Sequence, residues 1–223
     1  MPRGAAQFGN CRKTPRGVSV FDATTCHSGD SMNIDLASRQ LIMLPGIYDS
    51  GPNHWQTRWQ QLDPQITRFE PSDWDQPRLD DWLPALSRAV SATVPDSPVL
   101  IAHSLACLLV PIWAATAALP VAGAVLVAPI DPDRSAYPDE AAEFRDFPRR
   151  PLPFPTLVVS SLDDHYATAD WSSRFAQDLG ARVVVAGALG HINADSGLAD
   201  WQQGRDLVTA FCAGLAPPWS LGR

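Results

Sequence analysis

The chain has 223 residues, of which 45% are hydrophobic, and its formal net charge is −7 at pH 7. This length fits one domain of ordinary size with a sizeable core. An acidic chain without a basic run is a poor nucleic-acid binder, because contacts with phosphates need clustered Lys and Arg.

Lysine and cysteine usage narrows the chemistry further. Lys13 is the only lysine and precedes the predicted domain, which excludes a Schiff-base lysine, a Ser–Lys dyad and a P-loop lysine from the core. The four cysteines form no CxxC pair and have no zinc spacing, so we expect free thiols, no metal and a reducing, cytoplasmic location. No run of about 18 apolar residues occurs, and we therefore expect no membrane span.

The two ends of the chain differ from its middle. Residues 1–38 are polar, rich in Gly, Ser and Thr, and lack the apolar stretch of a signal peptide. We interpret them as a disordered leader or an over-extended start. A single domain is predicted over residues 39–215, followed by a Pro-containing tail at 216–223.

Within the predicted domain, short apolar runs alternate with segments of helical spacing. In chain order these are strand 41–44, helix 54–62, strand 66–69, helix 79–94, strand 99–102, helix 105–119, strand 121–127, strand 156–160, helix 168–179, strand 182–185 and helix 198–213. Strands that are apolar on both faces suit a mostly parallel sheet with helices on both faces, and the alternation predicts a doubly wound α/β fold. Residues 129–155 are too short for a full cap domain, and we expect a loop or a short lid helix there. Ligands bind at the carboxyl ends of the strands in such sheets.

The strongest chemical signal is a serine between a strand and a helix. Ser104 follows the apolar run 99–102 directly, and the helical pattern starts at the next residue. This is the context of a nucleophile elbow, in which the positions two before and two after the serine must be small. Ala102 and Ala106 occupy those positions. The alternative is a serine that only caps an ordinary helix.

A nucleophilic serine needs a base and an acid, which follow it in the order Ser, Asp or Glu, His. His191 comes shortly after the last predicted strand and is the expected base, whereas His103 is expected to point away from the site. The acid should follow strand 156–160, where spacing leaves Asp163 and Asp164 as alternatives. Asp131 is a less favoured acid.

The remaining site residues follow from the same geometry. The backbone N–H of Leu105 and that of Ile47, in the loop after the first strand, are the expected oxyanion-hole donors. The candidate pocket residues are Tyr48, His54, Trp55 and Tyr166, and Trp201 is a further candidate.

Several longer motifs resemble those of one known family. They are Leu44-Pro45-Gly46, His54-Trp55-Gln56 with Trp59, Asp73-Trp74-Asp75-Gln76-Pro77, the elbow 102–106, Pro151-Leu152-Pro153-Phe154-Pro155, Ser161-Leu162-Asp163-Asp164-His165-Tyr166 and the string 190–197. The chain from Leu41 to Phe211 resembles the retinoblastoma-binding-protein-9-like serine hydrolases, the YdeN-type branch of the α/β hydrolases.

This resemblance implies the α/β-hydrolase fold without a full cap domain, no cofactor, and a triad of Ser104, Asp164 and His191. Asp164 is chosen because the family acid directly precedes a Pro-aromatic pair, although His165 stands here in place of the proline. The expected function is cleavage of a small ester or amide through an acyl-enzyme on Ser104. A catalytically weak or inactive protein-binding module of the same fold is the alternative, and a lyase or haloperoxidase is a third. Nothing in the sequence points to a particular protein partner.

Overall fold

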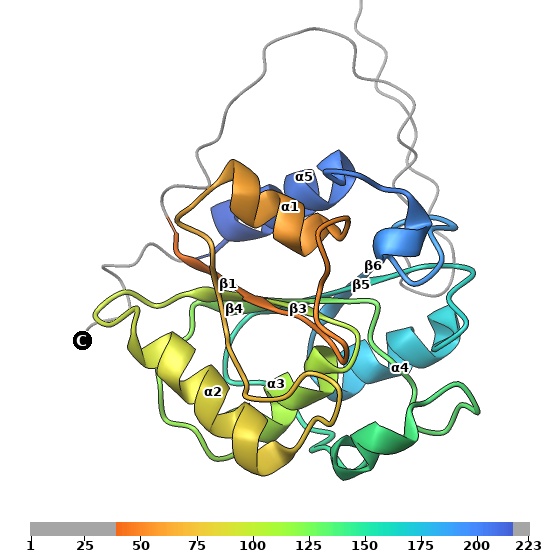
Figure 1. The fold of residues 1–223 in the computed structure, drawn as a ribbon, viewed down its shortest axis with the longest axis horizontal. Coiled ribbons are helices and arrows are strands. Elements are labelled where there is room, and N and C mark those ends of the chain that lie inside the picture. Colours follow the sequence, from red (N-terminus) through yellow and green to blue (C-terminus); the bar gives the residue numbers. More distant parts are fainter. Residues whose placement is uncertain (1–38, 216–223) are drawn as a thin grey trace, which may run out of the picture. The chain divides into compact units, whose positions relative to one another are not determined.

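The computed structural model describes residues 39–215, so the predicted leader (1–38) and tail (216–223) lie outside the described residues. The described chain forms one six-stranded sheet in the order β2-β1-β3-β4-β5-β6, and every neighbouring pair is parallel (Figure 1). The strands are β1 (Leu41–Leu44), β2 (Thr67–Arg68), β3 (Val99–His103), β4 (Gly123–Val127), β5 (Thr156–Ser160) and β6 (Arg182–Val185). The helices are α1 (Trp55–Leu62), α2 (Leu79–Ser91), α3 (Ala106–Ala114), α4 (Ala169–Asp178) and α5 (Gln202–Ala213), with short 3-10 helices η2 (Asp139–Phe144) and η3 (Ala194–Ser196).

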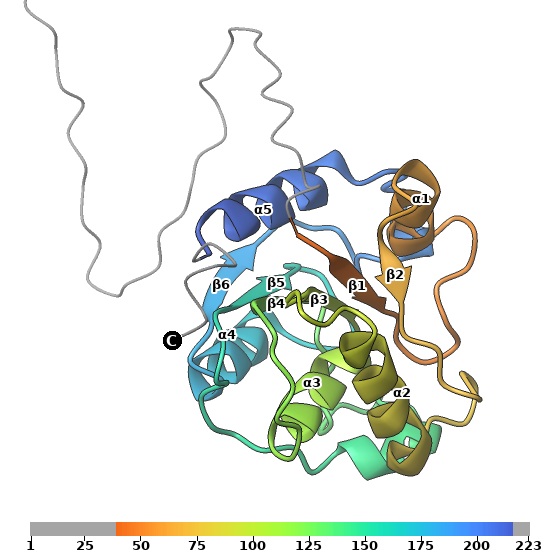
Figure 2. The ribbon, with the colours of Figure 1, turned by 90° about the vertical axis from the view of Figure 1, so that its left-hand side faces the viewer.

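Helices cover both faces of this sheet, as the sequence predicts. Figures 1 and 2 show α1 and α5 on one face and α2, α3 and α4 on the other. Every residue of β1, β3, β4 and β5 is buried, because each of these strands has neighbours on both sides and helices above and below. β6 differs: it is the edge strand, and Val183 and Val185 are 37% and 41% exposed.

Several predicted boundaries shift for local reasons. The predicted strand 66–69 shrinks to Thr67–Arg68 at the other edge of the sheet. The predicted helix 198–213 begins only at Gln202, because Ala199 and Trp201 have left-handed backbone with φ of 50° and 39°. The predicted helix 79–94 ends at Ser91, shortly before Pro95, because a residue that precedes proline disfavours helical backbone.

The connection between β4 and β5 contains no cap domain. Its one helix in the described chain is η2, which buries Ala141 and Phe144 against the core on the α2 side. Of the two alternatives expected for residues 129–155, a loop or a short helix, the structure has a short helix, and it packs on the domain itself.

Two properties of the described residues bear on earlier expectations. Cys107 and Cys212 are both free; Cys107 is buried and Cys212 is half-buried. Burial raises the pKa of the Cys107 thiol, and it raises that of Cys212 to about 11. No helix between residues 39 and 215 combines the length and apolar character needed to cross a membrane.

Candidate active site

The nucleophile candidate lies at a sharp turn between β3 and α3. Ser104 has a φ of 57°, a left-handed conformation that non-glycine residues rarely adopt. Its N–H donates to the carbonyl oxygen of Val127 at 3.0 Å, which ties the turn to the end of β4. α3 begins two residues later, at Ala106, so the turn has the strand–serine–helix geometry of a nucleophile elbow.

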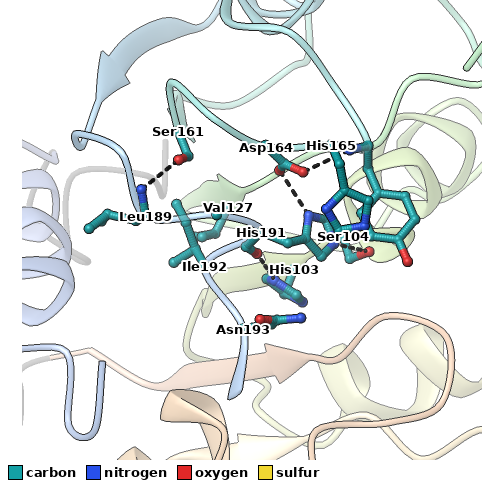
Figure 3. A network of polar contacts seen from close by, with 12 residues as sticks. His103, Ser104, Val127, Ser161, Asp164, His165, Leu189, His191, Ile192 and Asn193 are labelled. Carbon is teal, nitrogen blue, oxygen red and sulfur yellow. Dashed lines mark hydrogen bonds and ion pairs between the residues drawn. The ribbon is translucent and has the colours of Figure 1, made fainter. Parts of the chain in front are cut away.

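A continuous chain of hydrogen bonds runs from Ser104 to Asp164 (Figure 3). The Ser104 Oγ lies 2.9 Å from His191 Nε2, and His191 Nδ1 lies 2.8 Å from Asp164 Oδ2. Because a carboxylate only accepts, Nδ1 carries the proton and Nε2 is free to accept the serine hydroxyl. All three side chains are buried, with exposures of 7%, 6% and 8% for Ser104, His191 and Asp164. The structure therefore brings together the three residues that the resemblance implies.

Asp163 and Asp164, which spacing alone does not separate, have different partners. Asp164 accepts the backbone N–H of Tyr166 through Oδ1, which leaves Oδ2 directed at His191. Asp163 faces outward and accepts from the Ser161 hydroxyl and the Gly190 N–H, both at 2.8 Å. These bonds, that from Ser161 first, lower the pKa of Asp163 below its ordinary value. Of the two candidates, Asp164 is therefore the one whose carboxylate contacts His191.

The less favoured acid has a structural partner instead. Asp131 accepts the backbone N–H of Asp133 at 2.9 Å, which is a local turn interaction. It makes no contact with His191 among the hydrogen bonds of the described chain.

The loop that carries Ile47 packs against the elbow that carries Leu105. A Cβ added to Gly46 would lie 2.8 Å from the Ser104 Cβ and 3.3 Å from the Leu105 nitrogen, so the loop after β1 touches the turn. Only glycine allows this approach. Within residues 39–215, neither the Leu105 N–H nor the Ile47 N–H donates to a backbone carbonyl. Neither N–H is therefore engaged by the backbone of the described chain, and Ile47 lines the pocket that contains Ser104.

A pocket of about 220 Å³ opens over the serine. It is lined by Ile47, Tyr48, Asp49, Gly51, His54, His103, Ser104, Ile130, Pro138, Tyr166, His191, Asn193 and Ala194. Three of the four candidate pocket residues, Tyr48, His54 and Tyr166, are among them. The Tyr166 ring centroid lies 4.4 Å from that of His191, so this tyrosine forms the wall beside the base.

Two predicted pocket residues lie elsewhere. Trp55 and Trp201 are 1% and 4% exposed. They pack in the core between the sheet and helices α1 and α5, with their ring centroids 5.0 Å apart. The expectation that they line the pocket is wrong. The amphipathic pattern of α1 turns Trp55 toward the sheet, and Trp201, at the start of α5, packs against it there.

His103 also departs from its expectation. It does not point away from the site: its Nε2 lies 3.0 Å from the carbonyl oxygen of His191, and its ring lines the pocket. Because a carbonyl only accepts, Nε2 carries the proton and donates. Burial, with smaller contributions from His54 and His191, lowers the pKa of His103 well below its ordinary value, so the ring is neutral. Burial likewise lowers the pKa of His54 to about 3.

Besides His103, six residues that line the pocket were not predicted from the sequence: Asp49, Gly51, Ile130, Pro138, Asn193 and Ala194. Asn193 lies within the string 190–197 that carries the family resemblance, and this was the available signal. Ile130 and Pro138 come from the connection after β4 and carry no chemical motif. In the described part of the chain, no group of three or more His, Cys, Asp or Glu side chains is arranged to hold a metal ion.

Comparisons with known proteins bear on the family and the fold of this chain. The model of the serine hydrolase family matches residues 41–210. The structure of a YdeN-like hydrolase from Pectobacterium atrosepticum is 30% identical, with a TM-score of 0.69 over 78% of this chain and 91% of that chain. A search of curated proteins finds no match.

More distant structures share the fold. The ydeN gene product of B. subtilis is 23% identical, with a TM-score of 0.65 over 78% of this chain and 99% of that one. An esterase domain from a Rhodothermus marinus protein is 15% identical, with a TM-score of 0.59 over 79% and 87% of the two chains. The chain therefore belongs to the serine hydrolase family, in its YdeN-type branch, and is a hydrolase of the α/β-hydrolase fold.

Proposed function

We propose that this hydrolase cleaves a small ester or amide through an acyl-enzyme on Ser104, with His191 as general base and Asp164 as the orienting acid. The observation that carries the proposal is the unbroken hydrogen-bonded chain from Ser104 Oγ through His191 to Asp164, at 2.9 and 2.8 Å. A protein that only binds a partner has no need of this arrangement, whereas nucleophilic catalysis requires it.

The reaction follows from the protonation states. As Ser104 Oγ attacks the substrate carbonyl carbon, its proton passes to His191 Nε2, and Asp164 stabilises the imidazolium through the Nδ1–H. The tetrahedral intermediate expels the alcohol or amine, which takes the proton from Nε2. A water molecule then attacks the acyl-enzyme, gives its proton to His191, and releases the acid while Ser104 regains its proton.

The developing oxyanion would lie against the N–H groups of Leu105 and Ile47. Gly46 allows these two segments to touch. A Cβ added to it would lie only 3.3 Å from the Leu105 nitrogen. Hydrogen bonds from such preorganised donors become stronger as negative charge develops on the oxygen in the transition state. Loss of one donor costs about 10²–10³-fold in kcat in enzymes of this type.

The pocket favours a small, uncharged acyl or leaving group. Its volume of about 220 Å³ is below the roughly 300–1,000 Å³ of pockets that take drug-sized ligands. Among the described residues that line it, none is Lys or Arg. Its one carboxylate, Asp49, is paired with Arg68 at 2.6 Å, so the lining offers neither a cation to an anionic substrate nor an unpaired anion to a cationic one.

The test is labelling with a fluorophosphonate probe, with turnover of short p-nitrophenyl esters and the matching anilides measured in parallel. We expect wild type to be labelled, and Ser104→Ala and His191→Ala to lose both labelling and turnover. Ser173→Ala, which removes an exposed serine on α4, is the control and should behave as wild type. Folded wild type that neither labels nor turns over substrate would overturn the proposal in favour of a binding module.

A further inference from the structure

The motif His54-Trp55-Gln56 lies outside the Ser–His–Asp chain, yet all three side chains are buried, at 4%, 1% and 0% exposure. It forms the start of α1, where His54 Nδ1 accepts the Gln56 N–H at 3.2 Å and caps the helix. Each of the three side chains reaches a different segment of the candidate active site. His54 packs edge-on against His103, with ring centroids 4.7 Å apart.

Trp55 reaches the segment that carries the base. Its indole N–H donates to the carbonyl oxygen of Ile192 at 2.8 Å, one residue after His191. The preceding carbonyl, that of His191, accepts from His103. Ile192 has a φ of 48°, which is strained for a β-branched residue and persists only where the surroundings impose it. Two buried donors on successive carbonyls supply that constraint.

Gln56 reaches both the nucleophile strand and the oxyanion loop. Its Nε2–H donates to the carbonyl oxygen of Ile101 in β3 at 3.1 Å, and its Oε1 accepts the Ser50 hydroxyl at 2.7 Å. Ser50 ends the loop that presents the Ile47 N–H. In that loop Tyr48 and Asp49 have left-handed φ values of 70° and 60°. One amide therefore joins a strained loop to the strand that leads into Ser104.

We propose that the first turn of α1 is the positioning element of the active site: Trp55 sets the orientation of His191, and Gln56 sets the distance between the oxyanion loop and β3. The inference rests on the proposed function. Neither side chain lines the pocket, so both act through the residues they hold. Rigid support of this kind matters because a displacement of about 1 Å in a catalytic group can cost about 10²-fold in rate.

The first arm of the test compares two tryptophans on the same helix. Trp59 is as buried as Trp55, at 1%, and its indole N–H also donates to a carbonyl oxygen, that of Asp200, at 2.6 Å. Substitution by Phe removes the N–H and keeps a ring at either position. We expect Trp55→Phe to lower kcat about 10–100-fold, with KM within about twofold, and Trp59→Phe to leave both within about twofold.

Melting temperatures separate positioning from a general loss of stability. Both variants should lose similar stability, and the assays are run well below both transitions. If kcat falls equally in the two variants, or in neither, the proposed role of Trp55 is wrong.

The second arm uses Ser50→Ala, which deletes one hydroxyl and leaves Gln56 in place. We expect kcat, and the affinity for a boronate that mimics the tetrahedral intermediate, to fall together by about tenfold while KM stays constant, because the oxyanion donor is used mainly in the transition state. Ser87→Ala is the control, since it removes a hydroxyl that accepts the Trp113 indole N–H outside the pocket. A boronate affinity unchanged from wild type would refute the role of Gln56, even if Trp55→Phe fails to fold.

Ser104→Ala distinguishes a failure of the proposed function from a failure of the proposed role of α1. If it retains wild-type turnover, the proposed function fails. If it is inactive but Trp55→Phe and Ser50→Ala match their controls, only the positioning role of α1 fails.

Discussion

The nucleophile side and the acid–base side of the active site are built differently. Ser104 is placed by main-chain geometry, between a buried strand and a helix, with Gly46 packed directly against the turn. Asp164 and His191 lie in the loops after β5 and β6, where side chains hold the backbone. The Ser161 hydroxyl accepts the Leu189 N–H at 2.8 Å (Figure 3). Asp163 accepts the Gly190 N–H, also at 2.8 Å.

This difference implies two ways in which the site can fail. The nucleophile side has no spare volume, so added atoms should damage it. The acid–base side depends on directed hydrogen bonds, so the loss of a donor or acceptor should damage it even when the shape is preserved. Substitutions that preserve shape or preserve polarity can therefore test the comparison.

Asp164→Asn should have the largest effect. It keeps the shape of the side chain but no longer favours the tautomer of His191 that accepts from Ser104, and we expect kcat to fall by about 10⁴-fold. Steady-state kinetics with a p-nitrophenyl ester measure this, with circular dichroism to verify folding. The neighbouring Asp163→Asn is the matched control, and a loss as large in that variant would contradict the assignment of the acid.

Gly46→Ala should have the next largest effect, through volume alone. The new Cβ would lie 2.8 Å from the Ser104 Cβ and 3.1 Å from the His103 carbonyl oxygen, so the oxyanion loop must move away from the elbow. We expect kcat to fall by about 10²–10³-fold, the cost of one displaced oxyanion donor.

Gly214→Ala is the control for this substitution, because its Cβ would meet its nearest neighbour at an ordinary 3.5 Å. Wild-type kinetics in Gly46→Ala would show that the loop after β1 is not packed against the elbow.

Buried His54, which packs against His103 beside the nucleophile, should make the stability of the fold depend on pH. Burial first, then Arg68 and His191, lower the pKa of His54 to about 3. Below the ordinary histidine pKa of about 6.5, His54 binds a proton in the unfolded chain but stays neutral in the folded one. The free energy of unfolding therefore falls as the pH drops from about 6.5 toward 3. The slope is at most about 1.4 kcal/mol per pH unit for this residue.

His54→Asn tests this effect, because Asn is also a strong helix N-cap. We expect a flatter dependence of the unfolding free energy on pH between about 4 and 6.5, measured by urea denaturation. His103, whose pKa is also lowered by burial, should retain part of the slope. An unchanged slope in the variant would mean that His54 titrates normally in the folded protein.

Asp163→Asn should have the smallest effect. The hydrogen bonds from Ser161 and Gly190 lower the pKa of this exposed carboxyl, so they stabilise the fold above the ordinary Asp pKa of about 3.9 and less as the pH falls below it. We expect a slightly lower melting temperature at neutral pH, a difference that shrinks toward pH 3, and a loss of kcat within a fewfold. A melting difference that grows on acidification would contradict the lowered pKa of Asp163.

The sequence by itself determined the order of strands and helices, the parallel sheet and the strand–serine–helix turn at the proposed nucleophile, Ser104. β5 and β6 have the predicted bounds, Thr156–Ser160 and Arg182–Val185. The elbow was predictable because strand, serine and helix are contiguous, so the residues that define it are neighbours in the sequence. His191 was predictable because parallel strands bring their carboxyl ends to one edge.

Only the tertiary structure decided which side chains meet across the site. The direction of the Asp164 carboxylate depends on His191, 27 residues away, and spacing could not separate it from Asp163. Trp55 lies in the core and contacts Ile192, 137 residues further along the chain, although its sequence position suggested a pocket wall. Helical periodicity identifies the buried face of an element but not the residue it meets, because that partner is set by how distant segments pack.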